Sequence, residues 1–514
     1  VKADDVAFLQ YTSGSTGNPK GVMVTHKNII HNLTIMQSYC NLNQDTNIVS
    51  WLPPYHDMGL ILCHLEVVYC GASGYYITPL NFLQNPKKWL YMLTKYSPAF
   101  SVAPNFAFDY CVDRISEAEK EGLDLSNLVA IGNAAEPVKV STLERFYEAF
   151  KKYGFKKSAF RPAYGLAEAT LYVSAEQSDL DFIYSSYSQE ELKNNRVVPV
   201  GKNHPQAYSI VSCGKPHPIL KIIHPDTHEE LPEQRIGEIW INSPSVAKGY
   251  WKNEETTNTI FHAQIRSDLS QSYYLRTGDL GFFDNGKLYI TGRLKDLIII
   301  RGCNYYPQDI EYSVEKAHPM INRSGAAAFP INLFGDAESL GIVCEINTKE
   351  PHIYEEVCQS IRKTIFNDHN LDVCQITLIP ARKMPKTTSG KVQRKQCKES
   401  IDIDEIPILY KFTQKNSEEN QSHKTNSTAS PSITAYALLD WFQKWLDKEN
   451  CFVPGKLYEC NFEECGIDSL KAAQISADLG VYLKMPLDPT LLWEQGTFGE
   501  LAEFLAEKAN ENVR

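Results

Sequence analysis

The stretch "LQYTSGSTGNPKGVMVTH", from Leu9 to His26, places a loop of glycine, serine and threonine between two apolar runs. Glycines let backbone N–H groups turn toward an anion, and the hydroxyl groups add further donors. Lys20 supplies a positive charge suited to a polyphosphate. The loop lacks the GxxxxGK[ST] pattern of a Walker loop. By itself it fits either a phosphate cradle or an ordinary surface turn.

The composition is that of a globular protein of several domains: 514 residues, 43% hydrophobic and 22% charged. A net charge of −11 without a basic block argues against a nucleic-acid partner. The longest aliphatic run, Leu297 to Ile300, is far too short to span a membrane. The 13 cysteines form no CxxC pair, and no signal-peptide pattern opens the sequence. These features predict reduced thiols and a cytoplasmic protein.

Strand-like and helix-like patterns alternate over residues 1–293, which predicts a large α/β region with several sheets. Its predicted strands include "VAFLQY", "NIVSWL", "SAF" and "GEIWIN", and a helix is predicted over 143–152. A smaller α+β region is predicted over 294–412, with strands at "DLIIIRG", "GAAAFP" and "LGIVCEI". We expect a flexible linker over 413–431, because "QKNSEENQSHKTNSTAS" has no large apolar residue.

Residues 432–510 are predicted to form an all-α bundle of four helices. Ser432 is a candidate N-cap for the first helix. One face of that helix repeats apolar residues at helical spacing: Leu438, Trp441, Phe442 and Trp445. Further helices are predicted over 469–483 and 497–508.

Six segments after the glycine loop resemble, in order and roughly in spacing, the AMP-forming adenylating enzymes. They are "WLPPYHDMGL" (51–60), "NAAEP" (133–137), "AYGLAEAT" (163–170), "LRTGDLGFF" (275–283), "GRLKDLIIIRG" (292–302) and "TTSGKVQR" (387–394). Each has a plainer interpretation when taken alone: Asp279 as a turn residue, His56 as a core histidine, Lys391 as a solvated lysine. Their joint occurrence favours the family.

The resemblance implies a nucleotide site for ATP. The glycine loop would hold the departing pyrophosphate, and Tyr164 would lie against the adenine beside the adenine loop. Asp279 would bind the ribose hydroxyls, and Arg293 would lie at the nucleotide. The loop residues implied are Thr12, Ser13, Gly14, Ser15, Thr16, Gly17 and Lys20, with Ala135 and Glu136 in the adenine loop.

The resemblance also implies the residues of the chemistry. Glu168 would hold Mg²⁺, His56 would gate the acyl site, and Lys391 would bridge the attacking and transferred groups. Lys391 belongs to the smaller region, so we expect that region to close on the larger one about a hinge at Lys295.

Details favour the fatty-acyl-AMP ligase branch, including "FLQNP", "APNFAFDYC" and "YPQDIE". The long polar segment between Ala175 and Val211 stands where that branch carries an insertion associated with disfavouring CoA; alternatively it is a loop without a role. The chain departs from the branch pattern at Ala134, which replaces a glycine, and at Cys303 and Tyr305. An alanine is tolerated at 134 if its φ is negative.

The segment "ECGIDSLKAAQI" (464–475) resembles the attachment motif of acyl carrier proteins, with Ser469 as the site of 4'-phosphopantetheine. The start of a helix stabilises a phosphodiester's negative charge. The plainer interpretation is an N-cap serine. The linker would span about 20–25 Å r.m.s. and keep a tethered carrier near millimolar effective concentration.

The sequence therefore predicts a ligase that activates a fatty acid with ATP and Mg²⁺ and passes the acyl group to Ser469. Expected partners are a phosphopantetheinyl transferase and a downstream polyketide or peptide synthase that takes a lipid starter unit. Two alternatives stay open: a long-chain fatty acyl-CoA ligase, and a non-catalytic remnant that acts only as a carrier. Because the stretch that holds the glycine loop begins within ten residues of Val1, the chain is expected to lack the front of its large region.

Overall fold

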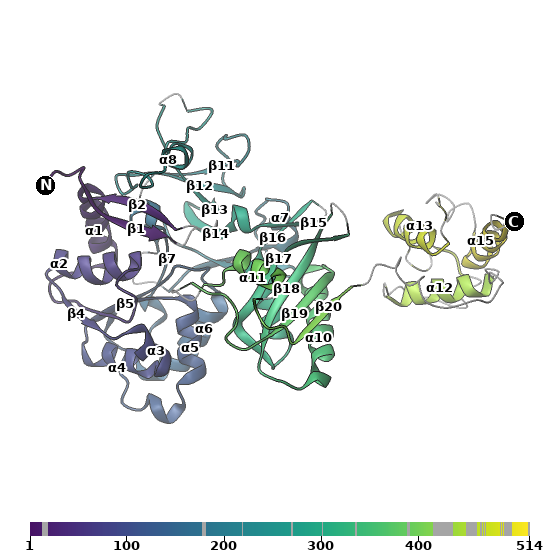
Figure 1. Cartoon of the computed structure of the whole chain (residues 1–514), viewed down its shortest axis with the longest axis horizontal. Helices are drawn as coiled ribbons and strands as arrows, with labels where there is room; N and C mark the ends of the chain where they lie inside the picture. The colour runs from purple at the N-terminus through teal and green to yellow at the C-terminus, as the bar shows by residue number, and fades with distance from the viewer. Residues whose placement is uncertain are drawn as a thin grey trace. The chain divides into compact units, whose positions relative to one another are not determined.

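The computed structural model describes residues 1–12, 19–176, 181–217, 219–268, 271–300, 302–334, 337–387, 391–403, 405–414, 435–448, 460–462, 465, 467, 469–483, 485, 487 and 496–511. The chain divides into two units, Val1–Asn416 and Ser417–Arg514. Figure 1 shows both, with the first in purple to green.

The opening stretch folds as an antiparallel hairpin of β1 (Val6–Thr12) and β2 (Lys20–Thr25). Thr12 pairs with Lys20, so the last residue of one strand faces the first of the next across the loop. Loop residues 13–18, with the predicted Ser13, Gly14, Ser15, Thr16 and Gly17, lie outside the described residues. Helix α1 (His26–Cys40) follows at once, begun by a capping box between Thr25 and Asn28.

The first unit is built on a six-stranded sheet that is parallel except at β8. Its strands in spatial order are β4 (Ser73–Tyr76), β3 (Asn47–Ser50), β5 (Ala99–Pro104), β6 (Leu128–Ala134), β7 (Phe160–Gly165) and β8 (Tyr172–Ala175). Its helices, besides α1, are α2 (Glu66–Cys70), α3 (Pro79–Gln84), α4 (Lys87–Lys95), α5 (Asn105–Arg114) and α6 (Val140–Phe150). In Figure 1, α1 and α2 lie above the strands and α3 to α6 below them. Strands connected through helices and covered on both faces are typical of α/β proteins.

Two antiparallel sheets complete the part that precedes residue 294. A hairpin pairs β9 (Tyr184–Ser188) with β10 (Ala207–Val211), and helix α7 (Gln189–Lys193) lies between them in sequence. A four-stranded sheet holds β11 (Ile219–Ile223), β12 (Gly237–Asn242), β13 (Leu275–Asp284) and β14 (Lys287–Arg293), with α8 (Glu254–Phe261) joining β12 to β13 in sequence. Described residues of the long polar segment thus form a strand–helix–strand unit rather than an open loop.

Residues after 294 begin with a small hairpin, β15 (Ile298–Ile300) and β16 (Cys303–Tyr305). A four-stranded sheet follows, made of β17 (Ile321–Phe334), β18 (Ala337–Ile346), β19 (Val373–Pro380) and β20 (Tyr410–Thr413). Its helices are α9 (Pro307–Ala317), α10 (Pro351–His369) and α11 (Arg394–Asp402). The Tyr312 hydroxyl lies 2.8 Å from Ser141 Oγ, and Arg323 pairs with Asp113, so α9 and β17 of this region contact α6 and α5 of the preceding region.

The second unit contains three described helices, α12 (Ala435–Lys448), α13 (Ser469–Leu483) and α15 (Phe498–Glu511). Leu438, Phe442 and Trp445 are buried in its apolar core, as the helical spacing predicted. The Trp445 indole donates to Asp478 Oδ2 at 2.9 Å and ties α12 to α13. The candidate N-cap Ser432 and any fourth helix lie outside the described residues.

The predicted mixed α/β architecture with several sheets is confirmed. One strand expectation needs correction: in "SAF", Ser158 and Ala159 form a 3₁₀ turn, and β7 begins only at Phe160. The turn ends in buried Phe160, which packs among Phe108, Phe146 and Phe155. No described helix is both long and apolar enough to cross a bilayer.

Candidate nucleotide and acyl-transfer site

One cavity of about 2730 Å³ in the first unit is lined by every described residue that the motifs singled out in this unit. Several come from the carboxyl ends of neighbouring parallel strands, where ligands bind in open α/β sheets. His56 follows β3, Glu136 follows β6, and Tyr164 lies near the end of β7. Thr12 and Lys20 reach the same cavity from the two ends of the glycine loop.

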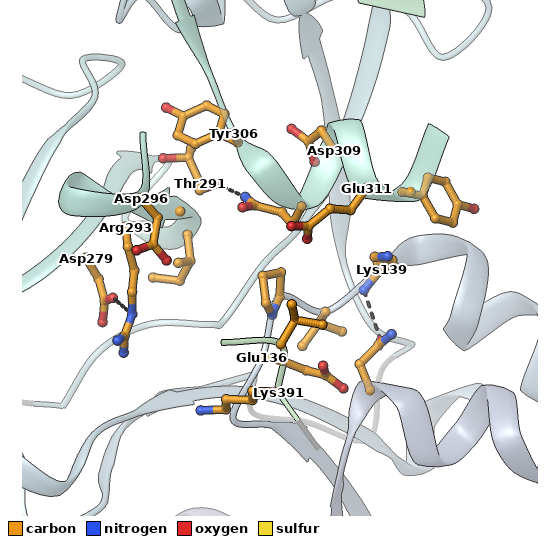
Figure 2. A pocket seen from close by; sticks show the side chains of 18 of the residues that line it. Glu136, Lys139, Asp279, Thr291, Arg293, Asp296, Tyr306, Asp309, Glu311 and Lys391 are labelled. Atoms are coloured by element: carbon orange, nitrogen blue, oxygen red, sulfur yellow. Dashed lines mark hydrogen bonds and ion pairs between the residues drawn. The ribbon is translucent and has the colours of Figure 1, made fainter. Parts of the chain in front are cut away.

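A network of polar contacts joins Tyr164, Asp279 and Arg293. The Tyr164 hydroxyl donates to Asp279 Oδ2 at 2.7 Å, and Arg293 Nε lies 2.9 Å from Asp279 Oδ1. Asp279 is only 6% exposed, whereas Arg293 lies at the surface of the cavity. The neighbouring carboxylate raises the pKa of Arg293, which therefore keeps its charge. Figure 2 shows this pair beside Asp296.

The adenine-loop candidates sit on a bent backbone just past β6. Ala135 adopts φ +72°, an uncommon value for a residue with a Cβ atom, whereas Ala134 keeps a negative φ. Alanine in place of glycine at 134 is therefore compatible with the backbone. The Phe106 N–H donates to Glu136 Oε1 at 2.6 Å. Burial nevertheless raises the pKa of Glu136.

Glu168 lies in a short 3₁₀ turn, Ala167–Ala169, and accepts a hydrogen bond from the Tyr250 hydroxyl at 2.8 Å. The turn ends at Thr170, whose φ of 70° and ψ of −65° form a rare, strained γ-turn closed by a 2.9 Å bond from Leu171 N–H to the Ala169 carbonyl. The fully buried Thr170 hydroxyl donates to the Ser245 carbonyl at 2.6 Å and holds this geometry.

His56 and Asp57 form a close pair at the entrance to the π-helical turn Met58–Leu65. Their Nδ1 and Oδ1 atoms are 2.6 Å apart, and the Met58 N–H donates to the same Asp57 oxygen at 2.7 Å. Burial opposes ionisation of Asp57, but the bonds from His56 and Met58 hold its pKa below the usual value. His56 is 26% exposed and lines the cavity, so it is not a fully buried core histidine.

Lys391 reaches the cavity from the segment between β19 and α11. Its N–H donates to Thr387 Oγ1 at 3.1 Å, and its carbonyl accepts from the Thr387 N–H at 2.8 Å. Burial, together with the positive charge of Arg293, lowers the pKa of Lys391, while Asp57, Glu136 and Asp279 oppose that shift. In Figure 2, Lys391 lies beside Glu136 and below Arg293. Within the described residues its ammonium forms no ion pair.

The motifs named no role for Arg394, three residues after Lys391. Its guanidinium binds both carboxylate oxygens of Glu311, at 2.6 and 2.7 Å, and reaches Asp296 at 3.1 Å. Asp296 ends the 3₁₀ turn that contains the predicted hinge residue Lys295. Arg394 therefore ties the Lys391 segment to the hinge turn. The position of Arg394 within the motif "TTSGKVQR" could have marked it as a site residue. The sequence alone could not show that it binds Glu311 and Asp296.

A magnesium site is compatible with the chemistry present. Glu168 offers a hard oxygen ligand in the cavity near Lys20 and Arg293. Mg²⁺ keeps several waters and is held by one or two carboxylates together with substrate phosphates, so a single carboxylate suffices. The described residues contain no group of three or more metal-ligating side chains that would form a cage.

Comparison with protein families divides the chain into three matched segments. Residues 1–251 match the AMP-binding enzyme family, and residues 295–409 match the AMP domain of Disco-interacting protein 2-like proteins. Residues 459–505, which include Ser469, match the phosphopantetheine attachment site family.

Similar proteins act on fatty acids. The medium-chain-fatty-acid–[acyl-carrier-protein] ligase JamA of Moorena producens is 40% identical over 404 residues, covering 77% of this chain and 68% of that protein. The long-chain-fatty-acid–AMP ligase FadD26 of Mycobacterium marinum is 37% identical, covering 78% and 70%. The crystal structure of the Legionella pneumophila fatty acyl-adenylate ligase with acyl adenylate and pyrophosphate is 44% identical, with a TM-score of 0.58, covering 80% and 72%. The chain thus spans about two thirds of the length of these relatives.

Proposed function

Because the chain belongs to the AMP-forming fatty-acid ligases of the AMP-binding enzyme family, we propose that it activates a fatty acid as an acyl adenylate and transfers the acyl group to phosphopantetheine on its own Ser469. In the first step a fatty-acid carboxylate oxygen attacks the α-phosphorus of ATP, and pyrophosphate leaves. In the second, a phosphopantetheine thiolate attacks the acyl carbonyl, and AMP leaves.

The observation that carries the proposal is the convergence of Lys391 with the Tyr164–Asp279–Arg293 network in one cavity. Asp279 is held in place to accept the ribose hydroxyls, and Arg293 keeps its charge for the phosphates. Lys391 brings a second cation toward the oxygens on which negative charge builds. Cations fixed before reaction stabilise such charge at little reorganisation cost.

The remaining groups take positioning roles in this proposal. His56, Ala135 and Glu136 line the cavity. In this proposal His56 would contact the fatty-acid carboxylate, and Ala135 and Glu136 would border the adenine. Thr12, Lys20 and the loop residues 13–18 hold the pyrophosphate. Bound at Glu168, Mg²⁺ would neutralise phosphate charge and orient ATP. Movement about Lys295 would later withdraw Lys391, so that the thiol of the carrier can enter.

Ser469 is supported as the acceptor by its family match and by its place as the first residue of α13. Free N–H groups at a helix start favour the phosphodiester's charge. The modification requires a phosphopantetheinyl transferase, and the acylated carrier would supply a starter unit to a polyketide or peptide synthase. None of the 12 described cysteines forms a disulfide, which supports a cytoplasmic location.

Two alternatives remain as outcomes of the test. A long-chain fatty acyl-CoA ligase would release its product as acyl-CoA, and the fused carrier family match disfavours it. A remnant that acts only as a carrier would have no physical reason to keep the strained turn beside Glu168 or the charge network around Asp279.

The test is the intact mass of the full chain, first after incubation with a phosphopantetheinyl transferase and CoA, then with ATP, Mg²⁺ and a panel of fatty acids. We expect a phosphopantetheine adduct that gains acyl mass, and loss of both in Ser469→Ala. Ser476→Ala is the matched control, because Ser476 lies on the same helix and its buried hydroxyl has no described hydrogen-bond partner. Acyl-CoA in solution without an acylated carrier would support the CoA ligase instead. An adduct that never gains acyl mass would support the carrier remnant.

A further inference from the structure

Lys20 and Glu168 come from separate motifs, and both contact Tyr250, which belongs to neither motif. The Lys20 ammonium lies 5.1 Å from the centre of the Tyr250 ring, and the Tyr250 hydroxyl donates to Glu168 Oε1 at 2.8 Å. Lys20 ends the glycine loop, whereas Glu168 lies in the turn after β7. Tyr250 itself is 7% exposed and lines the nucleotide cavity.

The backbone around Tyr250 is fixed to both neighbours. Residues 247–251, which we name the connector, run antiparallel beside β2, with Met23 N–H bound to the Gly249 carbonyl and Trp251 N–H bound to the Gly21 carbonyl, both at 2.8 Å. At its other end the Ala247 N–H donates to the Glu168 carbonyl at 2.9 Å. The connector thus bonds directly to the hairpin and to the Glu168 turn.

The residues just before the connector are held equally firmly by α1. Asn28 Nδ2 donates to the Pro244 and Val246 carbonyls at 2.8 and 2.9 Å, and Asn32 Nδ2 donates to Ser245 Oγ at 3.0 Å. Asn28 and Asn32 are buried. Tyr250 therefore projects from a backbone with little freedom to shift.

The phenol acts on the two charged groups in different ways. Its ring face attracts the Lys20 ammonium through a cation–π contact. Its hydroxyl bonds one oxygen of Glu168, and no described residue donates to the other oxygen, Oε2. Burial and the nearby Glu168 charge raise the pKa of Tyr250, so its hydroxyl keeps the proton that it donates.

We propose that Tyr250 is a positioning residue that fixes the Glu168 carboxylate for magnesium and holds Lys20 at a set distance from it. The inference rests on the proposed function, because it concerns how the same site binds Mg²⁺ and ATP. Tyr250 sets the Mg²⁺-dependent part of ATP binding through its hydroxyl and the Mg²⁺-independent part through its ring.

The test measures ATP affinity of the full chain by calorimetry, with and without Mg²⁺, for Tyr250→Phe and Tyr250→Leu. Phenylalanine keeps the ring over Lys20 and loses only the hydroxyl, so we expect the Mg²⁺-dependent gain in affinity to fall about tenfold while affinity without Mg²⁺ stays within about twofold. Leucine loses both contacts and should also weaken binding without Mg²⁺. Tyr274→Phe is the control, since that hydroxyl bonds Asp268 at 3.3 Å and lies outside the cavity lining.

A double-mutant cycle separates positioning from a general loss of structure. In a Glu168→Gln background, Tyr250→Phe should produce little further loss of the Mg²⁺ effect, because the hydroxyl acts through Glu168. Thermal unfolding of each variant reports whether it folds. A full Mg²⁺ gain in Tyr250→Phe, or equal losses in the two backgrounds, overturns the proposal. Absence of ATP binding in the unsubstituted chain would instead count against the proposed function.

Discussion

The cavity is made by two regions that hold their charged groups in different ways. Before residue 294, two carboxylates are held by side-chain partners: Asp279 binds Tyr164 and Arg293, and Glu168 binds Tyr250. After residue 294, Lys391 is held only through its backbone, and its ammonium meets the other charges across the cavity without an ion pair among the described residues. In the first region the side chains of Asp279 and Glu168 are themselves held, whereas in the second the ion pairs of Arg394 hold the segment that carries Lys391 and leave the Lys391 side chain unpaired among the described residues.

This difference suits the proposed function, in which movement of the smaller region brings Lys391 into the site and later withdraws it. A side chain bound in an ion pair would have to break that pair whenever the smaller region moved. Lys391 has only long-range attraction to Asp57, Glu136 and Asp279, so it can leave without that cost. Under the proposed function, the fixed groups bind the nucleotide, and Lys391 adds its charge only when its region closes on the other.

The largest effect is expected from Lys391→Ala. Removing a cation that acts mainly on developing charge should lower fatty-acid-dependent pyrophosphate exchange by about 10²–10³-fold, with a small change in ATP affinity. Calorimetry with ATP gives the affinity. Lys395→Ala is the matched control, because Lys395 is 62% exposed on α11 and its one ion pair among the described residues is with Glu399. An equal loss in ATP affinity and rate would mean that Lys391 is a binding group like Arg293, which would remove the contrast between the regions.

Asp279→Asn should act mainly on binding. It removes the partner of Arg293 but keeps an oxygen that can accept from the Tyr164 hydroxyl. We expect the KM for ATP to rise about 10–100-fold with a smaller change in kcat, measured by pyrophosphate exchange. A loss confined to kcat would show that the paired groups also act chiefly in the transition state.

Arg394→Met tests whether the ion pairs of Arg394 hold the segment that carries Lys391 in place. Glu311 is 10% exposed and would lose a two-point partner, so the free energy of unfolding should fall by about 2–3 kcal/mol in denaturant titrations. Exchange activity should fall severalfold even where the protein is fully folded, because the Lys391 segment loses its anchor at Asp296. Glu311→Gln, which keeps an acceptor, should be milder. Unchanged activity in the folded Met variant would contradict the anchoring role.

The smallest expected effect is a shift in the pH dependence of kcat/KM. Lys391 must carry a proton to supply charge, and burial lowers its pKa from the ordinary value of 10.5. As pH rises, kcat/KM should therefore fall at a less alkaline pH than an exposed lysine would impose. Lys391→Arg should move that alkaline limb upward, since a guanidinium keeps its proton. Superimposable limbs in the two proteins would exclude Lys391 as the titrating group.

Much of this could be read from the sequence because motifs record residue types at short spacing. The α/β architecture, the strand at "VAFLQY" and the helix that begins at Ser469 follow from such local patterns. The roles of Tyr250 and Arg394 were not predicted, because their hydrogen-bond partners lie 82 and 83 residues away in the sequence. The strand at "SAF" was predicted two residues early, since alternation cannot separate a 3₁₀ turn from a strand start.

The parallel strands β3, β5, β6 and β7 also bear on how this protein can change. Their hydrogen-bond register is set by backbone pairing and a buried aromatic core, while His56 and Glu136, which line the cavity, lie on the connections beyond the strand ends. Substitution in those connections leaves the register intact. Selectivity for the acid can therefore drift, or be engineered, separately from stability.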